Sequence, residues 1–266
     1  MNLHDTIADR YDEDFAGLMA RAITEWEAQI LTSVPPRDHR RVLDIAAGTG
    51  VSLAFLERKW GPLDFAAIDI SAKMLDIAGR RLTSPVRCIC DNALHADRHF
   101  APGSMDLILG QFLYSHVPPA KIFASAHRIL RPGGCFSVVT PTKDQFDGVF
   151  EGPLALTGKV LRAKSSLKKL WLQESHDDNM ALLRKAGFEI TAEKSYSHPF
   201  VIPNEEAFWD FSFRAGWLMA AYEQKFRSRL WMARSLGKVL LWINPDIFPL
   251  SARVNISLVI ARKPGA

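Results

Sequence analysis

Three carboxylates, Asp44, Asp69 and Asp91, each stand at or just after the end of a short apolar run. The first is followed by a turn of small residues at positions 46–50, which contains Gly48 and Gly50. Carboxylates accept hydrogen bonds from hydroxyl and ammonium groups, and glycine lets the backbone approach a ligand closely. A helix after such a turn offers free backbone N–H groups and the positive end of its dipole. These residue types predict a nucleotide-type binding site.

The spacing of the small residues in the turn distinguishes between the known nucleotide-binding motifs. If Gly48 and Gly50 are the first glycines of a dinucleotide fingerprint, G-x-G-x-x-G, then Leu53 stands where the third glycine belongs. A P-loop is also excluded, because no Gly-Lys-Ser/Thr follows the turn. What remains is the pattern D-x-A-x-G-x-G, which begins at Asp44 and has Ala46 in its third place. A glycine-rich turn that binds no ligand is the alternative.

This pattern resembles the first motif of the class I S-adenosylmethionine-dependent methyltransferases, D/E-x-G-x-G-x-G, with alanine at the first glycine. The resemblance implies that Asp44 holds the amino group of the cofactor's methionine moiety, beside the backbone of Ala46, Gly48 and Gly50. It implies that Asp69 binds both ribose hydroxyls. The alternatives are that Asp44 caps the turn and that Asp69 caps the following helix.

Further positions are assigned by the same resemblance. Asp91 would accept a hydrogen bond from the adenine amino group, although Asn92 displaces the usual small residue by one place; an ordinary Asp-Asn turn is the alternative. Four further contacts are expected from Ile70 and Met74, after the second strand, and from Asn92 and Ala93, after the third. Gln111 and Phe112, at the end of the fourth strand, are also expected to contact the cofactor, and Tyr11 is expected to close over it.

Two candidate catalytic residues, Tyr114 and His116, lie just past the fourth predicted strand. In open α/β sheets, chemistry gathers beyond the carboxyl ends of the strands. The ordinary pKa of histidine, about 6.5, suits a general base. A structural histidine and a core tyrosine are the alternatives. No metal site is expected, because the three cysteines, Cys88, Cys90 and Cys135, are too few and too irregularly spaced.

The elements that must position these residues follow an alternating order, which predicts βαβ units and a parallel sheet. The predicted strands are 41–46, 64–70, 86–90, 104–110, 135–140, 188–198 and 253–262, and the predicted helices include 50–59, 72–82, 119–130 and 174–186. With the resemblance, the fold class is α/β: a Rossmann-like, mostly parallel, seven-stranded sheet with helices on both faces. The last two strands are expected to form an antiparallel pair.

The predicted domain organisation has a core of residues 1–199 and 252–266, with a helical substrate cap, 200–251, inserted between the last two strands. Residues 141–172 are expected to form a second lid segment. Residues 208–248 are rich in aromatic side chains, which either make core or line an apolar acceptor pocket. Two basic runs, 159–169 and 225–238, are solvated faces or a membrane-docking surface.

Composition and charge limit the class of protein, its partners and its location. The chain has 266 residues, 48% hydrophobic and 23% charged, which are values of an ordinary globular protein. Its net charge of +4 does not by itself argue for nucleic acid, and none is expected as a partner. The first residues lack the pattern of a secretory signal, and no apolar run reaches the length of a membrane span. A cytoplasmic location is the expectation.

The sequence therefore predicts an S-adenosylmethionine-dependent methyltransferase that acts on a small, bulky apolar or aromatic acceptor, of natural-product, quinone or lipid-like type, by in-line displacement. The alternative is a protein of the same fold that catalyses a cyclisation or rearrangement without methyl transfer. The acceptor, the methylated atom and the oligomeric state are not determined by the sequence.

Overall fold

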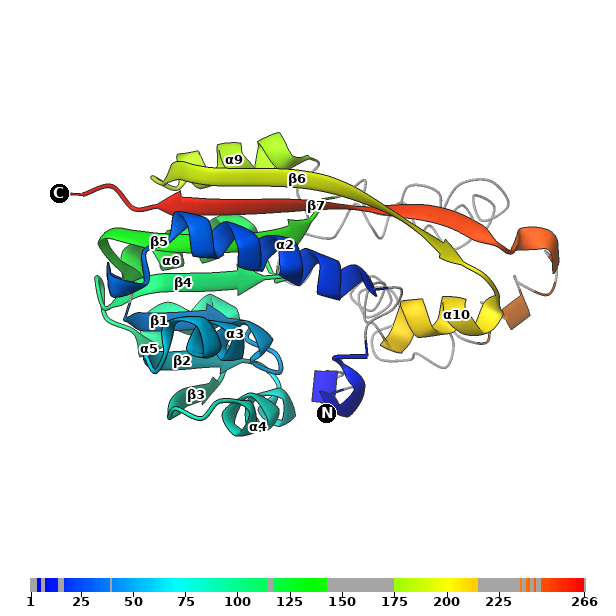
Figure 1. Ribbon diagram of the computed structural model, residues 1–266, viewed down its shortest axis with the longest axis horizontal. Helices are drawn as coiled ribbons and strands as arrows, with labels where there is room; N and C mark the ends of the chain where they lie inside the picture. The colour runs from blue at the N-terminus through cyan, green and yellow to red at the C-terminus, as the bar shows by residue number, and fades with distance from the viewer. Residues whose placement is uncertain are drawn as a thin grey trace.

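Seven strands form a single mixed sheet in the computed structural model, which describes residues 4–5, 8–13, 17–38, 40–113, 117–142, 175–214, 235, 238–239, 242 and 245–265. The order across the sheet is β3-β2-β1-β4-β5-β7-β6 (Figure 1). The strands are β1 (Arg41–Ile45), β2 (Asp64–Asp69), β3 (Val86–Cys90), β4 (Met105–Gln111), β5 (Leu130–Pro141), β6 (Glu189–Ile202) and β7 (Leu250–Arg262).

The first five strands are parallel, and β7 is antiparallel to both of its neighbours, β5 and β6. This arrangement confirms the predicted fold class. Because β1 and β4 are neighbours and run in the same direction, their carboxyl ends open at one edge of the sheet, which is where ligands of such folds bind.

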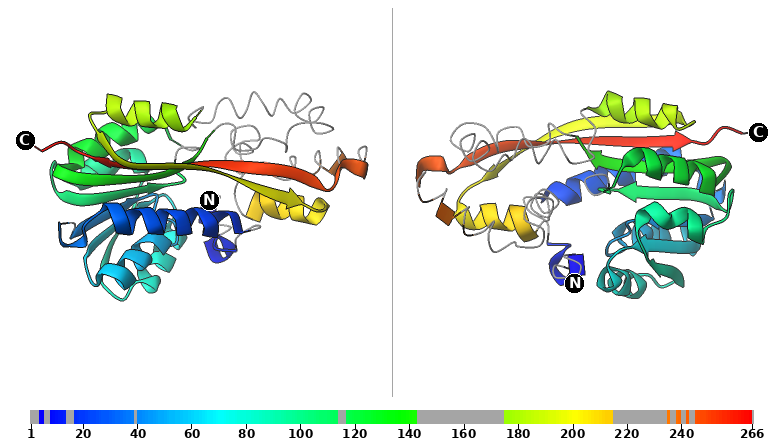
Figure 2. Two further views of the ribbon diagram at one scale, coloured as in Figure 1. Left: turned by 45° about the horizontal axis from the view of Figure 1, so that its top comes forward. Right: turned by 180° about the vertical axis from the view of Figure 1, so that it is seen from behind.

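One face of the sheet is covered by α2 (Leu18–Ser33), α3 (Val51–Trp60) and α4 (Ala72–Arg81), as Figure 2 shows. The stripe Leu18, Ala22, Trp26 and Ile30 of α2 repeats every four residues and is buried, as expected for an amphipathic helix on a sheet. The indole Nε1 of Trp26 donates to Ser137 Oγ at 2.8 Å, which fixes α2 on β5. The α2 helix therefore has one register on the sheet.

The opposite face is covered by α5 (Ala96–His99), α6 (Pro119–Ile129) and α9 (His176–Lys185) (Figure 2). Phe123 of α6 and Phe136 of β5 meet edge to face, with ring centroids 5.7 Å apart. Two apolar cores thus sandwich the sheet, one on each face. The predicted layers, with helices on both faces, are confirmed.

The last two strands are longer than the sequence predicts. β6 continues to Ile202, which pairs with Leu250 at the start of β7, so residues at both ends of the expected cap belong to the sheet. The reason is that β6 is an edge strand, where Pro199 has no ladder hydrogen bond to lose on its outer side. Of the rest of 200–251, the structure describes α10 (Glu205–Trp209), a π-helical turn (Asp210–Arg214) and a 3₁₀ turn (Pro245–Ile247).

β5 also begins earlier than predicted, at Leu130 instead of residue 135. The backbone of Gly133 and Gly134 exchanges hydrogen bonds with Lys263, which continues the pairing past the end of β7. The segment that reads as a turn in the sequence is therefore held in the sheet by its neighbour. No helix within the described ranges is long and apolar enough to cross a membrane.

Candidate active site

The turn from β1 to α3 has a backbone that favours glycine at three positions. Ala46, Gly48 and Gly50 have φ angles of 61°, 53° and 75°. A Cβ on Gly50 would lie 2.8 Å from the Cβ of Ala78, so this residue permits close packing of α3 on α4. Ala46 is the exception, because a side chain in the left-handed region costs on the order of 1–2 kcal/mol. The turn therefore holds strain at the place where the motif usually has glycine.

Asp69, the last residue of β2, ties this turn to α4. One carboxylate oxygen accepts from the backbone N–H of Gly48 at 2.9 Å, and the other accepts from the N–H of Ser71 at 2.9 Å. A carboxylate has about four acceptor positions, so each oxygen of Asp69 retains one. The side chain is 9% exposed and lines a pocket, which leaves it able to bind two adjacent hydroxyl groups.

Asp44 and Gln111 stand at the ends of the neighbouring strands β1 and β4. Asp44 is 2% exposed; burial, together with the charge of Asp69, raises its pKa to about 8. Among the described residues, Asp44 Oδ1 has no hydrogen-bond partner, and neither does Gln111 Nε2. Buried polar atoms without partners are rare and mark places where a ligand or water belongs. An unsatisfied acceptor and an unsatisfied donor therefore occur side by side at two adjacent strand ends.

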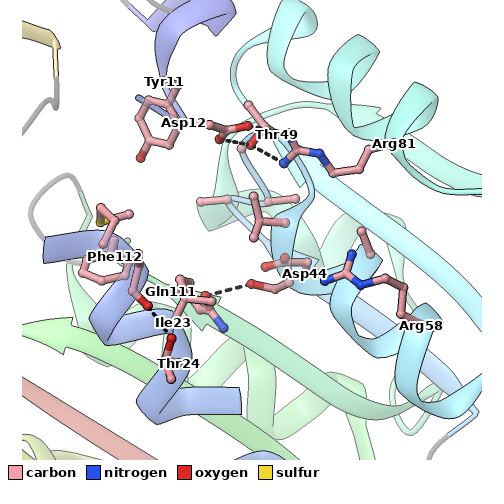
Figure 3. A pocket seen from close by; sticks show the side chains of 18 residues that line it. Tyr11, Asp12, Ile23, Thr24, Asp44, Thr49, Arg58, Arg81, Gln111 and Phe112 are labelled. Atoms are coloured by element: carbon pink, nitrogen blue, oxygen red, sulfur yellow. Dashed lines mark hydrogen bonds and ion pairs between the residues drawn. The ribbon is translucent and has the colours of Figure 1, made fainter. Parts of the chain in front are cut away.

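Two pockets meet at these residues. The larger has a volume of about 490 Å³ and extends from Asp44 and Gln111 to α2, where Met19, Ile23 and Thr24 line it (Figure 3). The smaller has a volume of about 260 Å³. It is lined by side chains from the ends of β2 and β3 and from α4, among them Asp69, Ile70, Met74, Asn92 and Ala93. The two pockets adjoin, because both are lined by Tyr11, Ala46, Gly48, Gln111 and Phe112.

The N-terminal segment is fastened over the junction of the pockets. Asp12 accepts a hydrogen bond from Thr49 at 2.7 Å and forms an ion pair with Arg81 of α4. The ring of Tyr11 lies 3.8 Å from the position that a Cβ of Gly48 would take. Burial, with the charges of Asp69 and Asp12, raises the pKa of Tyr11 to about 12, so its hydroxyl is neutral at physiological pH. Tyr11 thus covers the turn with an uncharged ring.

Asp91 is turned away from both pockets. One of its oxygens accepts from the N–H of Asn92 and from His95 Nδ1, and the other is 2.7 Å from His99 Nε2. The hydrogen bonds from His99 and His95 lower the pKa of Asp91 well below its ordinary value. The expected contact between this carboxylate and an adenine is therefore not favoured, because its acceptor positions face two imidazoles. Asn92 and Ala93, by contrast, line the smaller pocket.

The structure brings together most of the residues that the sequence singled out, with three exceptions. Asp91 faces its histidines, and Tyr114 and His116 lie outside the described residues. Sequence reasoning missed Ser52, the α2 side chains in the larger pocket, and Arg58. The four-residue spacing of Asp91, His95 and His99 was a signal for that cluster. Within the described ranges, no group of three His, Cys, Asp or Glu side chains is placed to hold a metal.

The site and fold agree with comparisons to known proteins. A family model described as a methyltransferase domain matches residues 42–134, which run from β1 into β5 and include the turn, Asp69 and Gln111. The chain is a class I S-adenosylmethionine-dependent methyltransferase. The matched residues supply most of the lining of both pockets, and the N-terminal segment and α2, which lie outside the match, supply the rest.

Its relatives include enzymes of quinone biosynthesis. The chain is 27% identical, over 214 residues, to the ubiquinone/menaquinone biosynthesis C-methyltransferase UbiE of Acidiphilium cryptum, covering 73% of this chain and 84% of that protein. It is 32% identical, over 133 residues, to the demethylmenaquinone methyltransferase of Clavibacter sepedonicus, covering 50% of this chain and 54% of that protein. The chain thus spans about half of the second relative.

A solved structure from Bacillus halodurans has the same fold. It superimposes with a TM-score of 0.60 at 18% identity, over 90% of this chain and 98% of the other. At that identity the match supports the fold, and the assignment of the reaction depends on the site and on the family model.

Proposed function

We propose that this protein transfers a methyl group from S-adenosylmethionine to a small, apolar or aromatic acceptor of quinone type. The observation that carries the proposal is the unsatisfied pair, Asp44 Oδ1 and Gln111 Nε2, in a pocket that adjoins the pocket of Asp69. The acceptor and the donor of this pair match the ammonium and carboxylate of the cofactor's amino-acid tail. The free acceptor positions of the Asp69 carboxylate match the ribose hydroxyls.

The chemistry of the donor set suits the cofactor. Asp44 would accept from the ammonium group, and Asp69 would accept from both ribose hydroxyls while it keeps its bonds to Gly48 and Ser71. Ile70 follows Asp69 and lines the smaller pocket, where its exposed apolar side chain would contact a flat base. Met74, Asn92 and Ala93 would complete the adenine pocket.

The bound cofactor supplies an electrophilic methyl group on a positively charged sulfur. An electron pair of the acceptor forms the new bond to the methyl carbon, the electrons of the broken carbon–sulfur bond stay on sulfur, and the acceptor loses a proton. The described residues serve this step by alignment and by exclusion of water, since Tyr11 covers the turn and Phe112 lines both pockets. Tyr114 and His116 are proposed to act at the acceptor, with His116 as a base.

An apolar acceptor is supported by the walls of the larger pocket and by the named relatives. Met19, Ile23 and Ala54 line the pocket beyond the cofactor residues, and a ring system needs such surfaces. Both relatives named above act on quinones, which supports a quinol ring as the methylated group. The expected helical cap, 200–251, and the second lid segment, 141–172, are proposed to enclose that ring.

The proposal is tested by cofactor binding and by product mass. Asp69→Ala is expected to abolish the binding of S-adenosylmethionine in calorimetry, because the ribose loses two hydrogen bonds and the turn loses its tie to α4. Asp64→Ala, at the opposite end of β2 and exposed, is the matched control and should leave the affinity unchanged. Unchanged affinity in Asp69→Ala would refute the site.

Product analysis then decides the reaction. Wild-type protein, cofactor and a short-chain demethylmenaquinol should give a product that is heavier by one methyl group, together with S-adenosylhomocysteine. Conversion of the quinol without this mass gain would favour the alternative, a rearrangement in the same pocket. A small aromatic phenol that is methylated equally well would refute the quinone preference.

A further inference from the structure

We infer that Ser52 is a positioning residue, which orients the side-chain amide of Gln111 so that its N–H group binds the carboxylate of the cofactor's methionine moiety. This inference rests on the proposed function, because it assigns a role within the same site. Ser52 belongs to the first turn of α3 and is 5% exposed. Its hydroxyl donates to Gln111 Oε1 at 2.8 Å (Figure 3).

The hydroxyl of Ser52 holds the oxygen end of the Gln111 amide in this structure. An amide has a donor end and an acceptor end of nearly equal shape, so packing alone does not choose between them. Because Ser52 donates to Oε1, Nε2 is the end that remains, and it is buried with no partner among the described residues. In this arrangement the serine satisfies the amide oxygen and leaves the amide N–H as the donor for a ligand.

A donor at this place complements Asp44. An α-amino acid presents an ammonium and a carboxylate on the same carbon, and the two strand ends present an unsatisfied acceptor and an unsatisfied donor in one pocket. With the amide reversed, Oε1 would face the ligand from the side of Asp44, and two acceptors would repel its carboxylate. The Ser52 hydrogen bond therefore selects the orientation that fits the zwitterion.

Two arginines line the same pocket, and one of them, Arg81, is engaged by other side chains. Arg81 donates to Thr49 and pairs with Asp12, and so it holds the N-terminal segment. Arg58 lies near Glu27 of α2, and its charge, with that of Lys59, partly offsets the effect of burial on the pKa of Glu27. The unsatisfied N–H of Gln111 is thus a donor available to a carboxylate beside Asp44, and Arg58 adds a positive charge to the wall of the same pocket.

The test compares two ligands that differ in the carboxylate alone. S-adenosylmethionine and its decarboxylated analogue are titrated calorimetrically into wild-type, Ser52→Ala and Ser52→Thr protein. Ser52→Ala is expected to weaken the first ligand about three- to tenfold, the size of one net hydrogen bond, and to leave the affinity for the analogue unchanged. Ser52→Thr keeps the hydroxyl and should restore most of the affinity.

A matched control is Ser125→Ala, which removes the hydroxyl of another buried helical serine, in α6 and without a hydrogen-bond partner within the described chain. It should change neither affinity. An equal loss for both ligands in Ser52→Ala would show a general structural effect and overturn the inference, and so would no loss for either ligand. If wild-type protein binds neither ligand, the proposed function itself fails.

A second variant keeps the inference testable if Ser52→Ala does not fold. Gln111→Glu retains an acceptor for the Ser52 hydroxyl but presents an oxygen, in place of N–H, to the ligand. It should weaken S-adenosylmethionine by at least tenfold and reverse the preference in favour of the decarboxylated analogue. A Gln111→Glu protein that keeps the wild-type preference would overturn the inference.

Discussion

The buried carboxyl of Asp44 makes cofactor binding depend on pH in a direction that the structure fixes. Its pKa is raised to about 8, first by burial and then by Asp69, so the free protein holds this group protonated at neutral pH. A protonated carboxyl cannot pair with an ammonium group, so binding must remove the proton. We therefore expect binding to strengthen with rising pH and Asp44→Asn to abolish this dependence.

The magnitude follows from the pKa. Below this pKa, each unit of rising pH multiplies the deprotonated fraction of Asp44 about tenfold, so the affinity should rise roughly fiftyfold between about pH 6 and pH 8 and then level off. About one proton should be released for each ligand bound at the acidic end of this window. The neutral Asp44→Asn side chain should bind with constant, weaker affinity across the same window.

The raised pKa of Asp44 also makes the stability of the ligand-free protein depend on pH, and this stability falls as the pH rises. A carboxyl whose pKa in the folded state lies above its ordinary value of 3.8 stabilises the fold most below that value, and this contribution is lost as the pH rises toward about 8. A shift of about four units corresponds to on the order of 5 kcal/mol of unfolding free energy. Asp44→Asn should therefore be more stable than wild type at about pH 9.

The assay is calorimetric titration of S-adenosylhomocysteine at several pH values, repeated in buffers with different ionisation enthalpies to count released protons. Asp44→Asn measured in parallel reports any titration of the ligand's own ammonium group, and the difference between the two proteins belongs to Asp44. Thermal unfolding without ligand gives the stability difference. A wild-type affinity that is flat between about pH 6 and pH 8, or a slope that is equally steep in Asp44→Asn, would refute the reasoning.

Three further changes test the surrounding structure. Gly50→Ala should destabilise the fold by about 2 kcal/mol or more in denaturant unfolding, because the new Cβ meets Ala78 at 2.8 Å and the φ angle is 75°; an unchanged midpoint would contradict the close packing. Ala46→Gly should relieve the strain at φ 61° and leave the unfolding free energy equal or up to about 1 kcal/mol higher, whereas a clear loss would show that no strain is present. Although burial opposes it, hydrogen bonds from Arg41 and Arg131 lower the pKa of Asp106. Asp106 should therefore stabilise the protein above pH 3.8 and less as the pH falls, so an acid unfolding profile with the same slope in Asp106→Asn would disprove this contribution.

The parallel half of the fold could be predicted because its signals are local. The apolar run before Asp44 and the turn after it belong to one short segment, and the observed parallel strands and their helices begin and end within a few residues of the predicted bounds, apart from the earlier start of β5. The length of β6 could not be predicted in this way. Pro199 reads as the end of a strand, and only its place at the edge of the sheet makes it harmless.

The site could be predicted at the strand ends but not across the helices. Asp44, Asp69 and Gln111 are placed by the rule that parallel strands open at one edge. Met19 and Ile23 reach the same pocket through the packing of α2, which no spacing in the sequence encodes. The histidine partners of Asp91 lie on the turns that follow it, and their pairing with the carboxylate depends on how those turns fold back.

The pairing of Ile202 with Leu250 brings together the two ends of the long chain segment that connects β6 to β7. A stretch of chain that leaves and returns at adjacent points is a removable module, since a tight hairpin turn could connect the same two residues. Phe208 and Phe211 anchor the start of the segment in the core, so a graft would keep residues up to that point. Descendants of this chain could therefore exchange the module while the sheet and the turn after β1 stay as they are.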